Sequence, residues 1–213
     1  MANCHSQMTG VLVLSQVTPV IRGLFKAFDL DESPGEGRAY IASADGISWS
    51  SVMDGLEAVA DEIGLPGADD VIQRWADHFG VSVRIAVLTQ GIDGDEDADL
   101  ATLFELAKAF DDGHGLAWIS AEQAMFCDAP RHNSCGGIGD FIGTHVSMQA
   151  DSADAHRVGK PLQEALADGD IEKAAEVVGR EVLLLLQRIN DPDQREQVKS
   201  ALRRLDAGVV LAE

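Results

Sequence analysis

GVLVLSQVTPVIRGLFKAF, residues 10–28, places a short aliphatic run directly before a well-marked helix start. Residues 10–14 have the length and composition of a buried strand. A threonine N-cap followed by proline at the first helical position, as in Thr18 and Pro19, is typical of a helix N-terminus. Apolar side chains then recur at helical spacing over 18–28. A strand that leads straight into a helix predicts a fold that contains both.

Strand and helix patterns continue to alternate toward the C-terminus. The clearest strand pattern is residues 81–88, where Val81, Val83, Ile85 and Val87 alternate with other residues. Polar or glycine-containing stretches separate the elements, and residues 1–9 are expected to be a loose leader. Further strands are expected at 38–44, 116–127 and 140–148, and loops at 29–37, 91–99 and 128–139. Helices are expected from a cap at Ser50 or Ser51 to about residue 63, from Asp69 or Asp70 to Gly80, and over 99–111.

From residue 151 onward the pattern is helical throughout. Ser152 is expected to cap the first segment, and Pro161 to break or kink it. Asp170 precedes the longest apolar stripe, and Asp191 with Pro192 forms another complete helix start. This region is therefore expected to be a helical hairpin or a three-helix segment.

Together these patterns predict an α+β fold. Residues 8–148 are expected to form a mixed or mainly antiparallel sheet with packed helices, and residues 151–206 a helical segment packed on it. A single domain overall is the alternative organisation. An enclosed α/β domain is the alternative architecture, because strands and helices alternate over residues 10–111.

The chain is strongly acidic, with 36 Asp and Glu against 16 Lys and Arg and a formal net charge of −20. Direct nucleic-acid binding is excluded as a leading function, because phosphate contacts need clustered Lys and Arg. An anionic membrane surface would repel the chain for the same reason. Three explanations stay open: a solvated surface that keeps the protein soluble, a halophilic host, or an acidic face that docks on a basic protein.

A cytoplasmic location is expected. No Lys or Arg precedes Arg22, so a secretory n-region is missing, and the longest purely aliphatic run, 182–186, is too short to span a bilayer. Three cysteines, an odd number, argue against a disulfide framework. The oligomeric state is left open.

Cys127, His132, Cys135 and His145 form the best candidate for a metal site. Thiolate and imidazole are the ligands that zinc prefers, and a structural site needs four of them in tetrahedral geometry. The stretch from His132 to the glycines after Cys135 resembles half of a zinc knuckle. A zinc-stabilised domain is therefore one alternative, although no cofactor is the leading expectation.

The same loop also allows a cysteine-dependent enzyme. A thiolate nucleophile needs a histidine to lower its pKa and a third group to orient that histidine. The residues that offer these roles are Cys127 or Cys135, with His132, His145 or His114, and with Asp128 or Asp140.

Motifs of the common catalytic sites are missing: the sequence holds no P-loop, H-E-x-x-H or G-x-S-x-G. The leading hypothesis is a non-enzymatic accessory protein that binds a basic protein partner, in its sharpest form as a nucleic-acid mimic or inhibitor. Acidic loops steer such partners and speed association. The residues expected to make contact are Asp29, Asp31, Glu32, Glu36, Asp93, Asp95, Glu96, Asp97 and Asp99.

Overall fold

The structure is a computed structural model, and it describes residues 4–67, 70–128 and 135–209. The chain divides into two compact units, Met1–Gly143 and Thr144–Glu213. The first unit combines an antiparallel sheet with helices, and the second is mainly helical. The α+β fold with a C-terminal helical segment is therefore confirmed.

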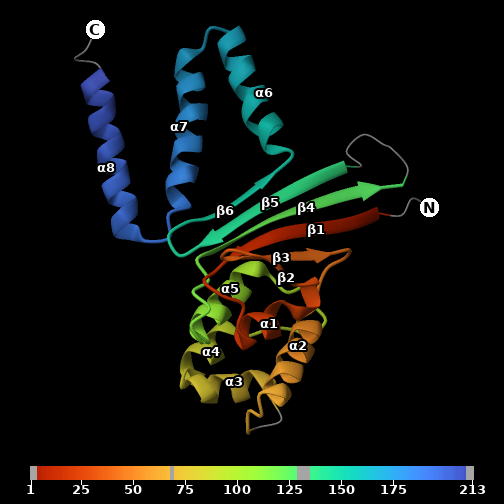
Figure 1. Cartoon of the computed structure of the whole chain (residues 1–213). Helices are drawn as coiled ribbons and strands as arrows, with labels where there is room; N and C mark the ends of the chain where they lie inside the picture. Colours follow the sequence, from red (N-terminus) through yellow and green to blue (C-terminus); the bar gives the residue numbers. More distant parts are fainter. Residues whose placement is uncertain (1–3, 68–69, 129–134, 210–213) are drawn as a thin grey trace. The chain divides into compact units, whose positions relative to one another are not determined.

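Five strands form a sheet in the described part of the first unit, in the order β2-β3-β1-β4-β5 (Figure 1). Each neighbouring pair is antiparallel, so this sheet agrees with the mainly antiparallel expectation. The long central strand β1 is paired on both sides, with β3 and β4. The strands are β1 (Cys4–Val13), β2 (Asp31–Gly35), β3 (Arg38–Ser43), β4 (Trp118–Cys127) and β5 (Cys135–Gly143).

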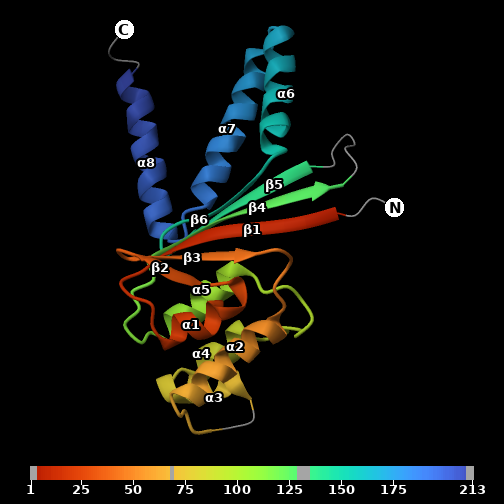
Figure 2. The same ribbon diagram turned by 45° about the vertical axis from the view of Figure 1, so that its right-hand side comes forward.

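Helices cover one face of this sheet, as both ribbon views show (Figures 1 and 2). Leu12, Ile41 and Ile119 point into this layer and are almost completely buried. Gly10 lies in the same layer, where an added Cβ would be 2.9 Å from the carbonyl oxygen of Ser120, so a larger residue would not fit. The helices are α1 (Pro19–Phe25), the 3-10 helix η1 (Lys26–Phe28), α2 (Trp49–Glu62), α3 (Val71–Phe79), α4 (Ser82–Leu88) and α5 (Leu100–Ala109).

The start of α1 is capped by a residue distant in sequence. Thr18 occupies the N-cap position as predicted, but its side chain makes no cap hydrogen bond. Its hydroxyl instead donates to the carboxylate of Asp112 at 2.7 Å, and the N–H of Val20 donates to the same carboxylate at 3.1 Å. Asp112 therefore ties the chain after α5 to the first turn of α1.

The strand predicted at 81–88 is wrong, because these residues form α4. Val81, Ile85 and Leu88 follow helical spacing, and all three pack on the core. Val83 and Val87, which completed the apparent alternation, are largely exposed. The segment is short enough to fit both periods, and packing against the core selects the helix.

Three loop predictions are also corrected. Residues 4–9 belong to β1, and residues 31–35 form the edge strand β2, whose sequence DESPG lacks strand-like alternation. Proline and charged residues are tolerated there because an edge strand pairs on one side only. Residues 135–139 belong to β5, whose N-terminal half is rich in glycine.

The second unit contains the short strand β6 (Ser147–Asp151) and the helices α6 (Asp154–Ala167), α7 (Ile171–Gln187) and α8 (Pro192–Val209). Helices α6 and α7 pack together through small buried side chains such as Ala165 and Ala174. An exposed ion pair between Arg157 and Glu181, at 3.0 Å, joins the same two helices.

Two of the predicted helix starts in this unit are confirmed. The carboxylate of Asp170 accepts from the N–H of Lys173, and that of Asp191 accepts from Gln194, both at 2.9 Å. Ser152 does not cap α6, whose N-cap position is Ala153, and Pro161 lies inside this helix. No helix in the described ranges is long and apolar enough to cross a membrane.

Candidate partner-binding surface

The first acidic loop is held at the edge of the sheet. Asp29 ends η1 in a left-handed conformation (φ 45°), which aspartate tolerates better than most residues. Asp31 begins β2, and hydrogen bonds from the hydroxyl and N–H of Ser33 hold the pKa of this carboxyl below its ordinary value. The Asp31 side chain is therefore kept charged at the surface.

Glu36 lies in the tight turn between β2 and β3. Its φ of 52° and the φ of 78° at Gly37 are both positive, as a two-residue type I′ hairpin turn requires. Glu36 is exposed, and so is Glu32 on β2. The hairpin therefore presents two further carboxylates to solvent.

The second acidic loop, residues 93–99, has a structural task as well. Its carbonyl groups at Gly94 and Glu96 accept from the first N–H groups of α2, those of Ser50 (2.9 Å) and Trp49 (3.0 Å). These N–H groups have no partner inside the helix, so the loop backbone satisfies them. The side chains of Asp93, Asp95, Glu96, Asp97 and Asp99 nevertheless remain exposed.

Asp97 and Asp99 are partly committed to the fold. Asp99 caps α5 by accepting from the N–H of Thr102 at 2.7 Å. The Asp97 carboxylate lies against Gly46, where an added Cβ would clash with it. Asp93, Asp95 and Glu96 are therefore the members of this loop that are better placed to contact a partner.

None of the nine predicted acidic contact residues forms an ion pair among the residues that the structure describes. The carboxylates that do pair lie elsewhere, for example Asp61 with Arg74 (2.9 Å) and Glu105 with Arg84 (2.9 Å). The charge of the two acidic loops is therefore not neutralised by ion pairs with the cations that the structure describes.

Part of the first acidic loop borders a groove on the sheet. The groove has a volume of about 480 Å³ and crosses β3, β1 and β4. Two cross-strand rows form its floor, in which Val11 lies opposite Tyr40 and Ser120, and Thr9 opposite Ala42 and Glu122. The complete lining is Thr9, Gly10, Val11, Asp29, Asp31, Tyr40, Ile41, Ala42, Ser120 and Glu122.

The groove combines negative charge with an aromatic ring. Asp29, Asp31 and Glu122 contribute carboxylates, and Tyr40 is 44% exposed. A guanidinium or ammonium group binds carboxylates by charge-assisted hydrogen bonds and stacks on aromatic faces. The groove, here called the acidic groove, therefore suits a basic side chain. Asp29 and Asp31 were predicted from the sequence as contact residues, whereas Tyr40 and Glu122 were not.

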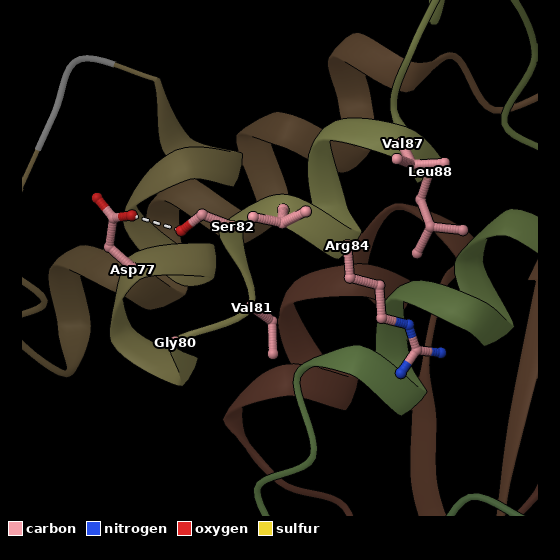
Figure 3. A pocket seen from close by; sticks show the side chains of 8 residues that line it. Asp77, Gly80, Val81, Ser82, Arg84, Val87 and Leu88 are labelled. Atoms are coloured by element: carbon pink, nitrogen blue, oxygen red, sulfur yellow. Dashed lines mark hydrogen bonds between the residues drawn. The ribbon is translucent and has the colours of Figure 1, made fainter.

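A second depression, of about 770 Å³, lies beside α4 and is mainly apolar (Figure 3). At one end the hydroxyl of Ser82 donates to the carboxylate of Asp77 at 2.8 Å. Val83, which is 85% exposed, and Val87 supply apolar surface. This depression offers apolar contact area rather than a set of converging reactive groups.

The predicted zinc ligands are distributed over both units. Cys127 ends β4 and is disulfide-bonded, which the odd cysteine number had argued against and which removes it as a thiolate ligand. Cys135 begins β5 and is exposed, whereas His145 belongs to the second unit. His132 lies outside the described residues. Within the described ranges no group of three or more His, Cys, Asp or Glu side chains is placed to hold a metal ion.

One of the histidines proposed to activate a cysteine, His114, has a structural role instead. His114 is only 2% exposed, and its ring nitrogens are bonded to the carbonyl of Ala107 (2.9 Å) and the N–H of Leu116 (2.8 Å). It therefore holds the turn between α5 and β4. Asp128 instead pairs with His5 at 2.8 Å, an exposed contact that the sequence did not suggest.

No protein-family model matches the chain, no curated protein is significantly similar to it, and no solved structure matches its fold. The surface itself is therefore the basis for a functional proposal.

Proposed function

We propose that this protein is a non-enzymatic accessory protein that binds a basic protein partner through the acidic surface of its first unit. The observation that carries the proposal is the acidic groove, which three carboxylates line together with an exposed tyrosine. The partner inserts an arginine or lysine side chain into this groove. The neighbouring carboxylates Glu32 and Glu36 raise the association rate by long-range attraction.

A strongly acidic protein attracts any polycation, so the test must separate the groove from the total charge. The probe is a short arginine-rich peptide, titrated at several salt concentrations and followed by fluorescence anisotropy. In the groove variant, Asp29→Asn, Asp31→Asn and Glu122→Gln remove three negative charges. Asparagine still tolerates a left-handed conformation at position 29 and still accepts from the N–H of Ser33, so the backbone is preserved.

The control variant removes three exposed carboxylates elsewhere in the same unit, by Asp45→Asn, Asp54→Asn and Glu57→Gln. Both variants change the net charge of −20 by the same amount. We expect the groove variant to weaken binding at least about tenfold and the control variant less than about twofold, because close charge pairs outweigh screened distant ones. Equal losses in the two variants would contradict a specific groove.

The contribution of the second acidic loop is tested with Asp93→Asn, Asp95→Asn and Glu96→Gln. This variant leaves Asp97 and the α5 cap Asp99 intact. A loss that appears mainly as slower association, and that disappears at high salt, would assign this loop a steering role. The mimic form of the proposal further requires that the wild-type protein displace the peptide from a short DNA duplex.

A further inference from the structure

The carboxylates of the acidic groove lie at its two ends. Strand register places Asp31 opposite Tyr40 and Tyr40 opposite Val11. Val11 in turn lies opposite Ser120, so the four residues form one row across β2, β3, β1 and β4. Glu122 lies on β4 two residues beyond Ser120, on the same face. With strands about 4.8 Å apart and a rise of about 3.4 Å per residue, the Cα atoms of Asp31 and Glu122 are about 16 Å apart.

This separation is too large for one basic group. A guanidinium binds acceptors that lie within about 3 Å of its nitrogen atoms, so a single arginine reaches the carboxylate at one end only. The volume of the groove, about 480 Å³, is in the range of pockets that hold drug-sized ligands. The groove therefore has space for two basic side chains and for the chain that joins them.

Between its ends the groove is uncharged. Apart from Asp29, Asp31 and Glu122, every residue of its lining is neutral. Val11 and Ser120 are half-buried, and a charged group that loses water over them gains no partner, so a ligand has to be neutral there. No cation in the described ranges pairs with a carboxylate at either end. Both ends are therefore available to a partner.

We propose that the groove binds an extended segment of the basic partner that carries two basic side chains four residues apart, an inference that rests on the proposed function. In an extended chain such side chains point to the same side and lie about 13 Å apart. The flexible stems of arginine and lysine cover the remaining distance. The middle residue of the five faces the neutral floor, and the second and fourth face solvent. The segment therefore has basic first and fifth residues and an uncharged third residue.

The two ends of the groove differ in which basic side chain they select. Tyr40 lies directly opposite Asp31, and side chains in such a cross-strand pair are about 5 Å apart. An arginine that binds Asp31 therefore also stacks on Tyr40, which its planar guanidinium does better than an ammonium group. Glu122 has no aromatic neighbour in the groove lining other than Tyr40, which lies two strands away. The Glu122 end accepts arginine and lysine equally.

The first test compares two peptides of equal charge by fluorescence anisotropy at low salt. One carries arginines at the first and fifth positions of a neutral five-residue core, and the other carries two adjacent arginines in the same composition. General attraction to a chain of net charge −20 is the same for both. Adjacent side chains point to opposite sides of an extended segment, so we expect the spaced peptide to bind at least about fivefold more tightly. Equal affinities would overturn the inference.

The second test removes the charge of one end at a time. Asp29→Asn with Asp31→Asn neutralises one end, and Glu122→Gln the other. Matched controls at exposed positions are Asp45→Asn with Asp54→Asn, and Asp45→Asn alone. We expect the loss at either end to weaken the spaced peptide at least about fivefold and to remove its advantage over the adjacent-arginine peptide, while the controls change either peptide less than about twofold.

The outcomes at the two ends separate this inference from the proposed function. If only one end affected binding, the groove would hold a single basic side chain; the two-ended segment would be overturned, but the acidic groove would remain the binding site. If neither end differed from its matched control, the proposed function would fail as well. Circular dichroism of each variant shows whether it is folded.

Lysine exchange tests the selectivity assigned to Tyr40. Replacing both arginines of the spaced peptide by lysine should weaken binding at least about threefold, because the stack on the aromatic ring is lost. At least one of the two single exchanges should change binding less than about twofold, since only one end of the groove holds a ring. Tyr40→Leu should remove the preference for arginine. A preference that survives this substitution would contradict Tyr40 as the selective residue.

Discussion

The two units differ in how far their large apolar side chains are buried. In the first unit, residues such as Leu12, Phe104 and Phe110 are completely buried between the sheet and the helices. In the second unit, Val182 and Leu185 lie on a regular stripe and remain 39% and 58% exposed. A buried apolar side chain contributes on the order of 1.5–3 kcal/mol to stability, and an exposed one contributes little of this. The first unit therefore contains its own source of stability, whereas the second leaves several large apolar side chains of α7 exposed.

The two units also differ in net charge. Residues 1–143 hold 23 acidic and 7 basic side chains, a difference of −16, and residues 144–213 hold 13 and 9, a difference of −4. The first unit therefore carries most of the negative charge that the proposed binding of a basic partner would use.

Truncating one residue in each unit gives the largest expected contrast. Phe104→Ala should lower the free energy of unfolding of the first unit by about 3–5 kcal/mol, because it leaves a cavity in a closed core. Leu185→Ala should change that of the second unit by less than about 1 kcal/mol when the chain is monomeric. Chemical denaturation at low protein concentration measures both changes in the free energy of unfolding, and circular dichroism follows the helices of both units.

Tryptophan fluorescence separates the two units in this experiment, because Trp49, Trp75 and Trp118 all belong to the first. If Leu185→Ala lowered the free energy of unfolding as much as Phe104→Ala does, at a concentration where the chain is monomeric, the contrast in burial between the two units would be contradicted. It would mean that the stripe is buried within a single chain.

A smaller effect is expected at the link between α5 and α1. Asp112→Ala removes the acceptor for both the Thr18 hydroxyl and the Val20 N–H, and Thr18 is buried. The loss should be about 1–3 kcal/mol, since a buried donor is left without a partner. Asp45→Ala, at an exposed carboxylate of the same unit, is the control. Equal effects of the two substitutions in fluorescence-monitored unfolding would show that Asp112 does not act through this link.

Local signals in the sequence were sufficient where a helix start is built from adjacent residues. The cap at Asp170, the Asp191–Pro192 start and the helix after Thr18 were all recognised in this way. The cap that Asp112 supplies to α1 depends on a contact between distant segments, so no local sequence pattern predicts it. The strand predicted at 81–88 was wrong for a different reason. Val81, Ile85 and Leu88 follow helical spacing, while the same short segment also fits the alternation of a strand.

The candidate site was predictable to a similar degree. Composition identified the exposed carboxylates Asp29 and Asp31, but the groove also needs Tyr40 and Glu122, which strand pairing brings beside them. In β4, Ile119 and Ala121 are buried, and alternation then places Glu122 on the opposite face. That signal was present in the sequence, whereas the register that joins the three strands was not.

The smallest expected effect concerns pH and should be confined to the second unit. A hydrogen bond from the N–H of Asp151, and then one from Arg157, hold the pKa of Asp154 below its ordinary value. A carboxyl whose pKa is lowered by folding stabilises the folded state above its unfolded pKa of about 3.9. That contribution disappears as the pH falls through the folded value. Asp154→Asn should therefore melt below wild type near neutral pH.

The difference between Asp154→Asn and wild type should shrink as the pH falls below about 4, because the wild-type carboxyl is then protonated as well. Thermal melts followed by circular dichroism over this pH range measure it, with Asp168→Asn as a control that removes the same charge after α6. Tryptophan fluorescence should be unaffected by either substitution, since the tryptophans report on the first unit. A change in the fluorescence melt would show that the two units unfold together, and the contrast in burial would then not extend to their stability.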